Sequence, residues 1–298
     1  MTGSIWVVFT LFGAAGQTAR NAMQRELTPR LGALGATLVR FLFGFPFALL
    51  FLAATIIMTG ASLPSGNFAF AGWTVLGALT QIGGTALMLM TMEHRSFVVT
   101  VAYLKAEPIL VAIMGLVFLG DPLSLMTIAA ILIAMAGVAA ISFRPQALMG
   151  GAKPALLGIS SAALFGLSSV SYRGAILALH MPGYVMAATV SLAAGLTLQT
   201  VLLLTWLVLF NRKTLKAVFE SWRPSLATGF TGAAASEMWF LAFALATAAS
   251  VRTLGLVDVL FAQGVSHMIF KQKTSRREVA GILLLLAGAI LIVWANPG

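Results

Sequence analysis

Residues 96–141 constrain the fold more than any other part of this chain. The stretch reads SFVVTVAYLKAEPILVAIMGLVFLGDPLSLMTIAAILIAMAGVAAI and is almost entirely apolar, yet Lys105, Glu107 and Pro108 lie in its first third. A charged side chain in the middle of a bilayer costs about 3 kcal/mol or more on insertion scales. We therefore expect this segment to cross a membrane and to line a polar cavity that the rest of the chain builds and gates.

The whole chain has the composition of a multi-pass membrane protein. Of its 298 residues, 60% are hydrophobic and only 9% are charged, whereas soluble domains carry about 25% charged residues. The net charge of +10 does not indicate nucleic-acid binding, because the basic residues lie between apolar runs and not on one soluble face. The absence of cysteine excludes a disulfide scaffold and a thiolate metal site.

The apolar runs predict an all-α membrane protein. A spanning helix needs about 20 apolar residues, so about ten such helices fill the chain and leave little for a soluble domain. Proline and glycine in the polar gaps mark where the spans end. The ten predicted transmembrane helices are residues 4–24, 35–59, 70–92, 97–119, 123–143, 155–178, 184–210, 225–248, 252–270 and 279–295.

Lysine and arginine outside these spans lie in the odd-numbered loops. The even-numbered loops and both termini hold none. Because cytoplasmic loops carry the excess of Lys and Arg, we expect the odd-numbered loops in the cytoplasm and both termini on the other side of the cell inner (plasma) membrane. The residues concerned are Arg25, Arg30, Arg95, Arg144, Lys153, Arg212, Lys213, Lys216, Arg223, Lys271, Lys273, Arg276 and Arg277.

The two halves of the chain resemble each other at a similar spacing. The matching segments are Phe12-Gly13 before Arg20 with Phe165-Gly166 before Arg173, Ala36-Thr37-Leu38-Val39 with Ala188-Thr189-Val190, and Ala136-Gly137-Val138 with Ala287-Gly288-Ala289. The last match places Glu107 over Asp258. Since each half has an odd number of spans, the second enters the membrane from the opposite side. We predict two inverted five-helix repeats in one membrane domain, residues 1–148 and 149–298, with the substrate site near mid-membrane between them.

With these features the chain resembles the drug/metabolite transporter superfamily, specifically its ten-helix EamA type. The resemblance is carried by Phe12-Gly13, Leu38-Val39-Arg40-Phe41-Leu42, Glu107-Pro108, Gly120-Asp121-Pro122-Leu123 and the closing Ala-Gly motifs of spans five and ten. It implies secondary active transport of a small metabolite, without naming the metabolite. Similar proteins usually have Glu where Asp121 stands and Pro where Val259 stands, and they usually keep both termini cytoplasmic, opposite to the orientation predicted here.

The candidate substrate-binding residues are polar or aromatic side chains inside the spans. They are Lys105, Glu107, Glu237, Asp258, Gln81, Tyr103, Trp239 and Arg252. Pro108 has no N–H, so we expect it to kink its helix and to free the carbonyl of Leu104 beside Glu107, where an ammonium group or a proton could be held. The alternative is that Glu107 is a buried structural partner of a basic residue.

Lys105 needs a partner from another helix. It lies two positions from Glu107, and helix neighbours that meet are three or four positions apart. Glu237 and Asp258 are the candidate partners, and such a pair across the two halves would act as a gate or a latch. A free Lys105 would instead favour an anionic substrate.

Glu107 and Glu237 are the candidates for proton coupling, because an apolar surrounding disfavours a carboxylate charge without a partner. For Glu237 the alternative is an ion pair with Lys105 or Arg252. Gly83 and Gly84 indicate close helix packing or, together with Pro108, a gating hinge.

Four arginines lie within the predicted spans but toward their ends. They are Arg20, Arg40, Arg252 and the slightly deeper Arg173. We expect such a side chain to extend toward the membrane surface. Arg252 becomes a ligand only if the substrate is an anion.

These residues predict a secondary active transporter that works by alternating access and is a candidate for proton coupling. The mixed charges favour a small polar or zwitterionic, amino-acid-like metabolite, with carboxylates for its ammonium end and Lys105 for its carboxylate end. One alternative is an exchanger of organic anions or phosphate esters that uses Lys105 and Arg252. Another is an exporter of cationic drugs that uses Glu107 and Glu237.

A membrane-embedded lipid-handling enzyme is disfavoured, because the candidate acids lie inside the spans and no catalytic motif is visible. We therefore expect no enzyme activity, catalytic residue, cofactor or metal. The expected partners are a small-molecule substrate and the lipid bilayer, with no nucleic acid, and the sequence leaves the oligomeric state open, a monomer included.

Overall fold

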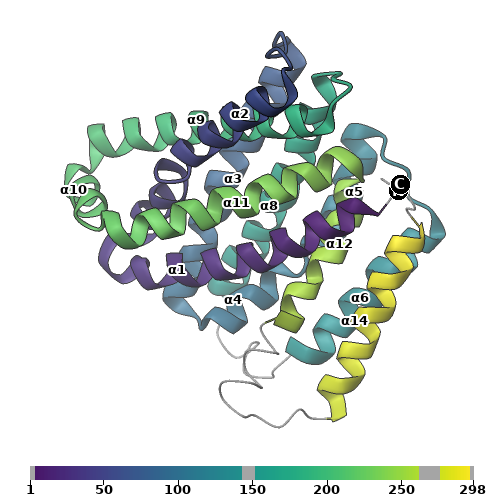
Figure 1. Ribbon diagram of the computed structural model, residues 1–298. Coiled ribbons are helices and arrows are strands. Elements are labelled where there is room, and N and C mark those ends of the chain that lie inside the picture. Colours follow the sequence, from purple (N-terminus) through teal and green to yellow (C-terminus); the bar gives the residue numbers. More distant parts are fainter. Residues whose placement is uncertain (1–3, 143–151, 262–275, 296–298) are drawn as a thin grey trace.

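The chain folds into a bundle of helices (Figure 1). The computed structural model describes residues 4–142, 152–261 and 276–295, and within these ranges the chain is helical with short turns and has no strand. The predicted all-α fold class is confirmed. The boundary predicted between residues 148 and 149 lies outside the described residues, as do Arg144, Lys271, Lys273 and the end of the ninth predicted span.

The described helices cover most of the predicted spans, but their bounds differ in several places. In the first half they are α1 (Ile5–Leu42), α2 (Phe45–Thr59), α3 (Phe68–His94), α4 (Phe97–Leu104), α5 (Glu107–Leu119) and α6 (Leu125–Ser142). In the second half they are α8 (Ala152–Ala178), α9 (Tyr184–Phe210), α10 (Arg212–Glu220), α11 (Trp222–Leu245), α12 (Ala248–Leu254), the 3₁₀ turn η1 (Gly255–Val257) and α14 (Arg276–Ala295).

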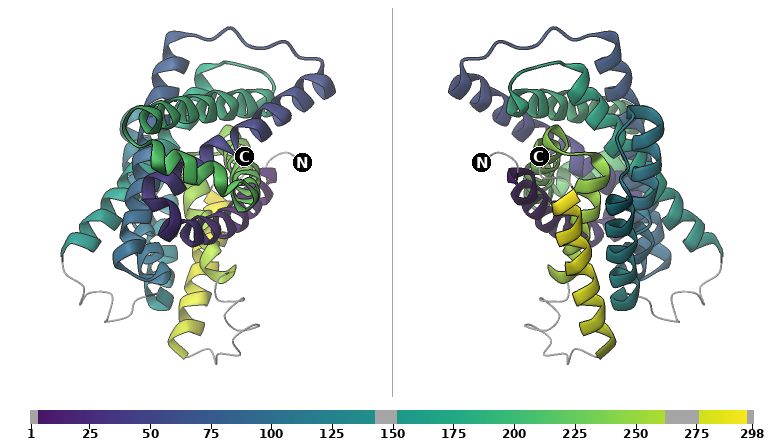
Figure 2. Two further views of the ribbon diagram at one scale, coloured as in Figure 1. Left: turned by 90° about the vertical axis from the view of Figure 1, so that its left-hand side faces the viewer. Right: turned by 90° about the vertical axis from the view of Figure 1, so that its right-hand side faces the viewer.

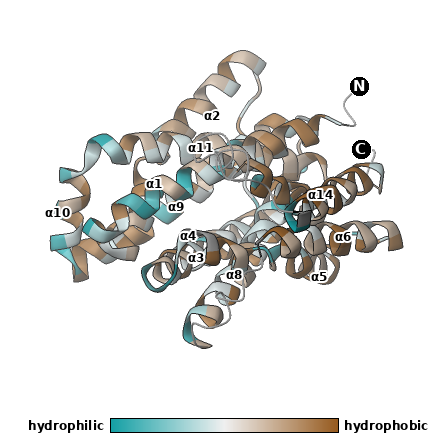
Figure 3. Ribbon diagram, turned by 90° about the horizontal axis from the view of Figure 1, so that it is seen from below, coloured by the Kyte–Doolittle hydropathy of each residue, from teal (hydrophilic) through white to brown (hydrophobic). Residues whose placement is uncertain are grey.

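Length and hydropathy indicate a multi-pass membrane protein. Within the described ranges, 6 helical segments are long and apolar enough to cross a membrane, namely 5–59, 68–94, 99–119, 152–178, 184–210 and 277–295, and Leu125–Ile141 forms a shorter apolar helix. Large apolar side chains lie on the outside of the bundle, among them Phe68, which is 99% exposed, and Leu125, which is 86% exposed. Figure 3 shows this hydrophobic exterior on α5, α6 and α14.

Helices from the two halves pack against each other in three main pairs. These are α1 with α11, α3 with α8, and α6 with α14. Figures 1 and 2 show α6 and α14 side by side at one flank of the bundle. A Cβ atom at Gly137 would lie 2.5 Å from the amide nitrogen of Leu285, and one at Gly288 would lie 2.6 Å from that of Ala134. The Ala-Gly motifs therefore allow the close backbone contact of this pair.

The first turn of the chain falls within the loop predicted between residues 24 and 35, but α1 extends further into this loop than predicted. Helix α1 continues through Pro29, and the backbone reverses at Gly32, whose φ of 69° and ψ of 170° are rarely adopted by other residues. The side-chain amide of Gln24 donates to the carbonyl of Ala36 at 3.0 Å, which ties the two limbs of α1 together across this corner. A second difference is α10, a short helix inside the predicted loop between spans seven and eight.

Two of the predicted spans, 97–119 and 252–270, are interrupted beside a charged residue, and a third, 35–59, is interrupted at Phe43 and Gly44 between α1 and α2. The span predicted at 97–119 divides into α4 and α5, with Lys105 and Ala106 in the turn between them. Pro108 lies in the first turn of α5, where its missing N–H is tolerated and leaves the carbonyl of Leu104 without its regular helical donor. The ninth span changes from α12 to η1 immediately before Asp258. The interruptions of the fourth and ninth predicted spans therefore lie beside Lys105 and Asp258.

Candidate substrate cavity

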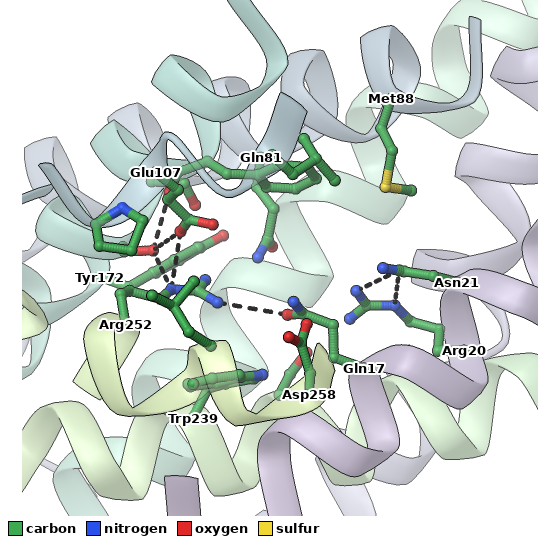
Figure 4. Close-up of a pocket in the computed structure, with 18 of the residues that line it drawn as sticks. Gln17, Arg20, Asn21, Gln81, Met88, Glu107, Tyr172, Trp239, Arg252 and Asp258 are labelled. Carbon is green, nitrogen blue, oxygen red and sulfur yellow. Dashed lines mark hydrogen bonds and ion pairs between the residues drawn. The ribbon is translucent and has the colours of Figure 1, made fainter. Parts of the chain in front are cut away.

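A polar cavity lies between helices of both halves (Figure 4). α1, α3, α4 and α5 contribute side chains from the first half, and α8, α11, α12 and η1 contribute from the second. Among the predicted site residues, Gln81, Lys105, Glu107, Pro108, Trp239, Arg252 and Asp258 line this cavity. Residues that the prediction missed also line it, including Gln17, Arg20, Asn21, Arg40, Ser168, Ser169, Tyr172 and Ser236.

Lys105 and Asp258 form an ion pair between the fourth and ninth predicted spans. Lys105 Nζ lies 2.5 Å from Asp258 Oδ1 and 2.6 Å from Oδ2. The two side chains are only 12% and 11% exposed. Of the two partners considered for Lys105 from the sequence, the structure selects Asp258, so one buried charge from each half neutralises the other.

Glu107 pairs with Arg252 in the same way. Arg252 Nε lies 2.9 Å from Glu107 Oε1, and Ser169 accepts a hydrogen bond from Arg252 at 2.9 Å and lies 3.3 Å from the same carboxylate oxygen. The guanidinium carbon lies 4.4 Å from the ring centre of Trp239, within the range of a cation–π contact. Arg252 thus faces the cavity and does not extend to the membrane surface, which differs from the expectation for its position.

Arg20 and Arg40 also point inward, and neither forms an ion pair within the described part of the chain. Arg20 is 2% exposed and Arg40 is 3% exposed. Arg20 donates to Asn21 Oδ1 from Nη2 at 2.8 Å and from Nε at 3.3 Å. Arg40 donates from Nη1 to Thr85 Oγ1 at 3.0 Å. The expectation that both arginines reach the membrane surface is therefore wrong, and the cavity holds two positive charges without a carboxylate partner.

A sequence signal for these missed residues exists on α1. Gln17, Arg20, Asn21 and Gln24 recur at the i, i+3, i+4 and i+7 spacing of one helix face within an apolar run. Such a polar stripe indicates a face turned away from lipid. Arg20 was assigned to the membrane surface because the span was predicted to end at residue 24, whereas α1 continues to the corner at Gly32.

Glu237 lies outside the residues that line the cavity. Thr189 Oγ1 donates to Glu237 Oε1 at 2.6 Å, and the second carboxylate oxygen is buried without a hydrogen-bond partner among the described residues. The alternative in which Glu237 pairs with Lys105 or Arg252 is wrong, because those bases pair with Asp258 and Glu107. Glu237 is therefore a buried acid on α11 without a described basic partner.

The remaining predicted site residues pack between helices. Tyr103 lies against α8, where a Cβ atom at Gly158 would be 2.7 Å from its side chain. Gly83 and Gly84 lie in the continuous helix α3, and a Cβ atom at Gly84 would lie 3.2 Å from the ring of Phe165. In this structure the two glycines form a close helix contact, and α3 has no kink at them.

Asp121 and Arg173 form a further ion pair outside the cavity. Arg173 Nε lies 3.3 Å from Asp121 Oδ2, and Nη1 donates to the carbonyls of Phe243 at 2.6 Å and Ala246 at 2.5 Å. Arg173 therefore lies inside the protein and not at the membrane surface as expected. It connects the turn after α5 to the end of α11.

The fold and the cavity together define a multi-pass membrane protein that encloses a charged, buried site. The model of the EamA-like transporter family matches residues 2–143. This match confirms the resemblance to the drug/metabolite transporter superfamily over the first half of the chain. It supports a membrane transporter of this superfamily.

The fold is also seen in a solved structure, described only as the crystal structure of a protein. It is 16% identical in sequence, and the match covers 97% of this chain and 97% of the other, with a TM-score of 0.69. At this identity the likeness shows the fold alone. No curated protein matches the chain.

Proposed function

We propose that the protein is a secondary active transporter that moves a small polar metabolite across the cell inner membrane by alternating access. The observation that carries this proposal is the cavity, in which four basic and two acidic side chains from both halves meet inside a bundle with an apolar exterior. Buried charges are costly in a membrane protein and mark substrate or ion pathways. No cofactor or nucleotide site is required for such transport.

The arrangement of the helix pairs supports two inverted five-helix repeats. If span one corresponds to span six and span three to span eight, the pair α1–α11 exchanges with the pair α3–α8. The pair α6–α14 then corresponds to itself. The interruptions at Lys105 and Gly255 also lie at equivalent positions, and interrupted helices at the centre of repeats are where transporters bind substrates. We keep residues 1–148 and 149–298 as the two repeats of ten transmembrane helices.

The two ion pairs supply a mechanism for holding the halves together. Lys105–Asp258 and Glu107–Arg252 both join the fourth span to the ninth. Alternating access requires one half to move against the other around a fixed site. We therefore propose that these pairs act as latches, which rearrange when substrate enters the cavity.

The substrate is a polar metabolite with an anionic group. An amino-acid-like zwitterion fits if its ammonium group displaces Lys105 from Asp258 or Arg252 from Glu107. An organic anion or phosphate ester is the other candidate, and it is favoured by the two basic side chains that have no carboxylate partner. Export of cationic drugs has less support, because Glu107 already holds a base and Glu237 lies outside the lining residues.

We assign proton coupling to Glu237 in preference to Glu107. Glu107 is paired with the guanidinium group of Arg252 at 2.9 Å, so its protonation would break an ion pair. Glu237 has only the hydroxyl of Thr189 as a described partner, so its protonation does not require an ion pair to break.

The test of this function is uptake into liposomes that contain the purified protein. Labelled amino acids, dicarboxylates, sugar phosphates and organic cations are supplied to the wild type, to Glu107→Gln and to Glu220→Gln as the matched control. Glu220 lies on α10 and its side chain is 53% exposed, so its substitution leaves the cavity unchanged. We expect saturable uptake of one class, reduced at least tenfold in Glu107→Gln only. The absence of uptake of every class, relative to empty liposomes, would refute the proposal.

A further inference from the structure

We propose that Arg20 and Arg40 form an anion-binding subsite in the cavity and that the substrate is a small organic anion whose carboxylate or phosphate oxygens bridge the two guanidinium groups. This inference rests on the proposed transport function and specifies its substrate class. It differs from the organic-anion alternative considered from the sequence, in which Lys105 and Arg252 would bind the anion.

The balance of charge in the cavity supports this assignment. The lining residues include four basic side chains and two acidic ones. Lys105 and Arg252 are each neutralised by a carboxylate within 2.9 Å. The two positive charges that remain belong to Arg20 and Arg40, and no acid among the described residues compensates them. A substrate with one or two negative charges would supply the missing counter-charge.

The two arginines lie close to each other, although they come from different limbs of α1. A Cβ atom at Gly232 on α11 would lie 3.1 Å from Cδ of Arg20 and 3.6 Å from Cγ of Arg40. Both side chains therefore cross the same glycine, whose missing side chain leaves room for them. Because the aliphatic parts of both arginines pack against one small residue, their guanidinium groups can contact the same ligand.

Two N–H donors among the residues that line the cavity have no hydrogen-bond acceptor in the described part of the chain. Arg40 Nε is buried without a hydrogen-bond partner among the described residues, and so is the indole N–H of Trp239, which lines the same cavity. Figure 4 shows the guanidinium of Arg20 held beside Asn21 and turned toward the middle of the cavity. N–H groups can be satisfied only by an acceptor, and arginine binds carboxylate and phosphate oxygens in a two-pronged geometry.

These observations rank the possible substrates. A dianion would neutralise both arginines, and a monoanion would neutralise one. A zwitterion would bring an ammonium group that needs a carboxylate, and both carboxylates of the cavity already hold a base. A cation would add to the positive charge. We expect affinity to fall in that order.

A purely structural role for Arg20 and Arg40 and a role in anion binding predict different melting temperatures for the neutral variants without ligand. If they only fasten α1 through Asn21 and Thr85, neutralising them lowers the melting temperature of the empty protein. If they bind an anion, each is an uncompensated buried charge in the empty protein. Neutralising one then leaves the melting temperature unchanged or raises it, because residues that serve binding often destabilise the ligand-free protein.

The experiment measures thermal unfolding of the purified full chain in detergent at constant ionic strength. The added probes are sodium succinate, glycerol 3-phosphate, alanine, choline chloride and sodium chloride. A ligand that binds the folded state raises its stability as the ligand concentration rises. The variants are Arg20→Gln, Arg40→Gln, the charge-preserving Arg20→Lys, and Arg212→Gln on α10 as the control.

We expect succinate or glycerol 3-phosphate to raise the melting temperature of the wild type, and the one that does so identifies a carboxylate or a phosphate substrate. The apparent affinity should fall about 10- to 100-fold in Arg20→Gln and in Arg40→Gln, the range for loss of a charged hydrogen-bonding group. It should fall less in Arg20→Lys, which remains informative if a neutral variant does not fold, and should not change in Arg212→Gln.

The inference fails if alanine or choline stabilises the protein and neither organic anion does. It also fails if stabilisation by an anion persists in both neutral variants, or if no probe stabilises the wild type. Uptake of a metabolite in the liposome assay together with any of these results would keep the transport function and reject only the subsite.

Discussion

The ion pair between Lys105 and Asp258 provides a quantitative test of how the two halves are held together. Its N–O distances are 2.5 and 2.6 Å, and the two side chains are 12% and 11% exposed. Substituting Asp258 by Asn leaves the ammonium group without a counter-charge. Removing one partner of a buried pair costs about 3–5 kcal/mol, and we take about 3 kcal/mol because both residues border a polar cavity.

The assay is the melting temperature of the purified protein in detergent. At about 2–4 °C for each kcal/mol, Asp258→Asn should lower the melting temperature by about 6–12 °C. Lys105→Gln should act similarly, because it leaves the carboxylate unpaired. The double variant should recover most of the loss, since neither charge remains and the two single effects are then not additive.

The control is the exposed pair of Lys216 and Glu220 on α10. These side chains are 80% and 53% exposed and lie 3.9 Å apart. Exposed pairs of this kind contribute about 0.5 kcal/mol or less, so Glu220→Gln should shift the melting temperature by about 1–2 °C at most. If Asp258→Asn shifts it no more than this control, or if the double variant is as unstable as the sum of the single variants, the reasoning is refuted.

Three further predictions test other parts of the structure. Gly288→Ala should lower the melting temperature, because its Cβ atom would lie 2.6 Å from the backbone of α6, whereas Gly72→Ala, where nothing lies within 4 Å, should leave it unchanged or raise it. Equal effects of the two substitutions would contradict the α6–α14 contact. A fluorescent protein that folds only in the cytoplasm should remain dark when fused after Gly298, and fluorescence there would reverse the predicted orientation. Glu237→Gln should retain substrate binding but lose any stimulation of uptake by a proton gradient, and stimulation that persists would assign coupling elsewhere.

The helical fold could be predicted from the sequence because each span is a local feature. Apolar runs of about 20 residues need no knowledge of distant contacts. Lys105, Glu107 and Asp258 could be predicted as site residues for a similar reason, since any charge inside an apolar run must be compensated. The closing Ala-Gly motifs were also informative, because small residues in a membrane helix indicate a close neighbour.

The sequence limited the partner of Lys105 to Glu237 or Asp258 but could not decide between them, because the choice depends on which helix faces which. Glu237 lies as deep in its predicted span as a cavity residue would, yet it faces Thr189 on α9. Arg20 was misplaced by a local error, since α1 does not end at residue 24 as predicted but continues to the corner at Gly32. Depth along a span can be estimated from sequence, whereas the direction of a side chain needs the neighbouring helices.

The central claim is that the substrate passes through this cavity, and a single thiol tests it directly. The chain has no cysteine, so Ser236→Cys places one thiol in the cavity lining and Ser191→Cys places one at a fully buried position of α9 outside it. Uptake of the transported metabolite into liposomes is measured before and after treatment with N-ethylmaleimide. The account predicts that treatment abolishes uptake by Ser236→Cys, that substrate slows this modification, and that Ser191→Cys is unaffected. Complete modification of Ser236→Cys with unchanged uptake would contradict it.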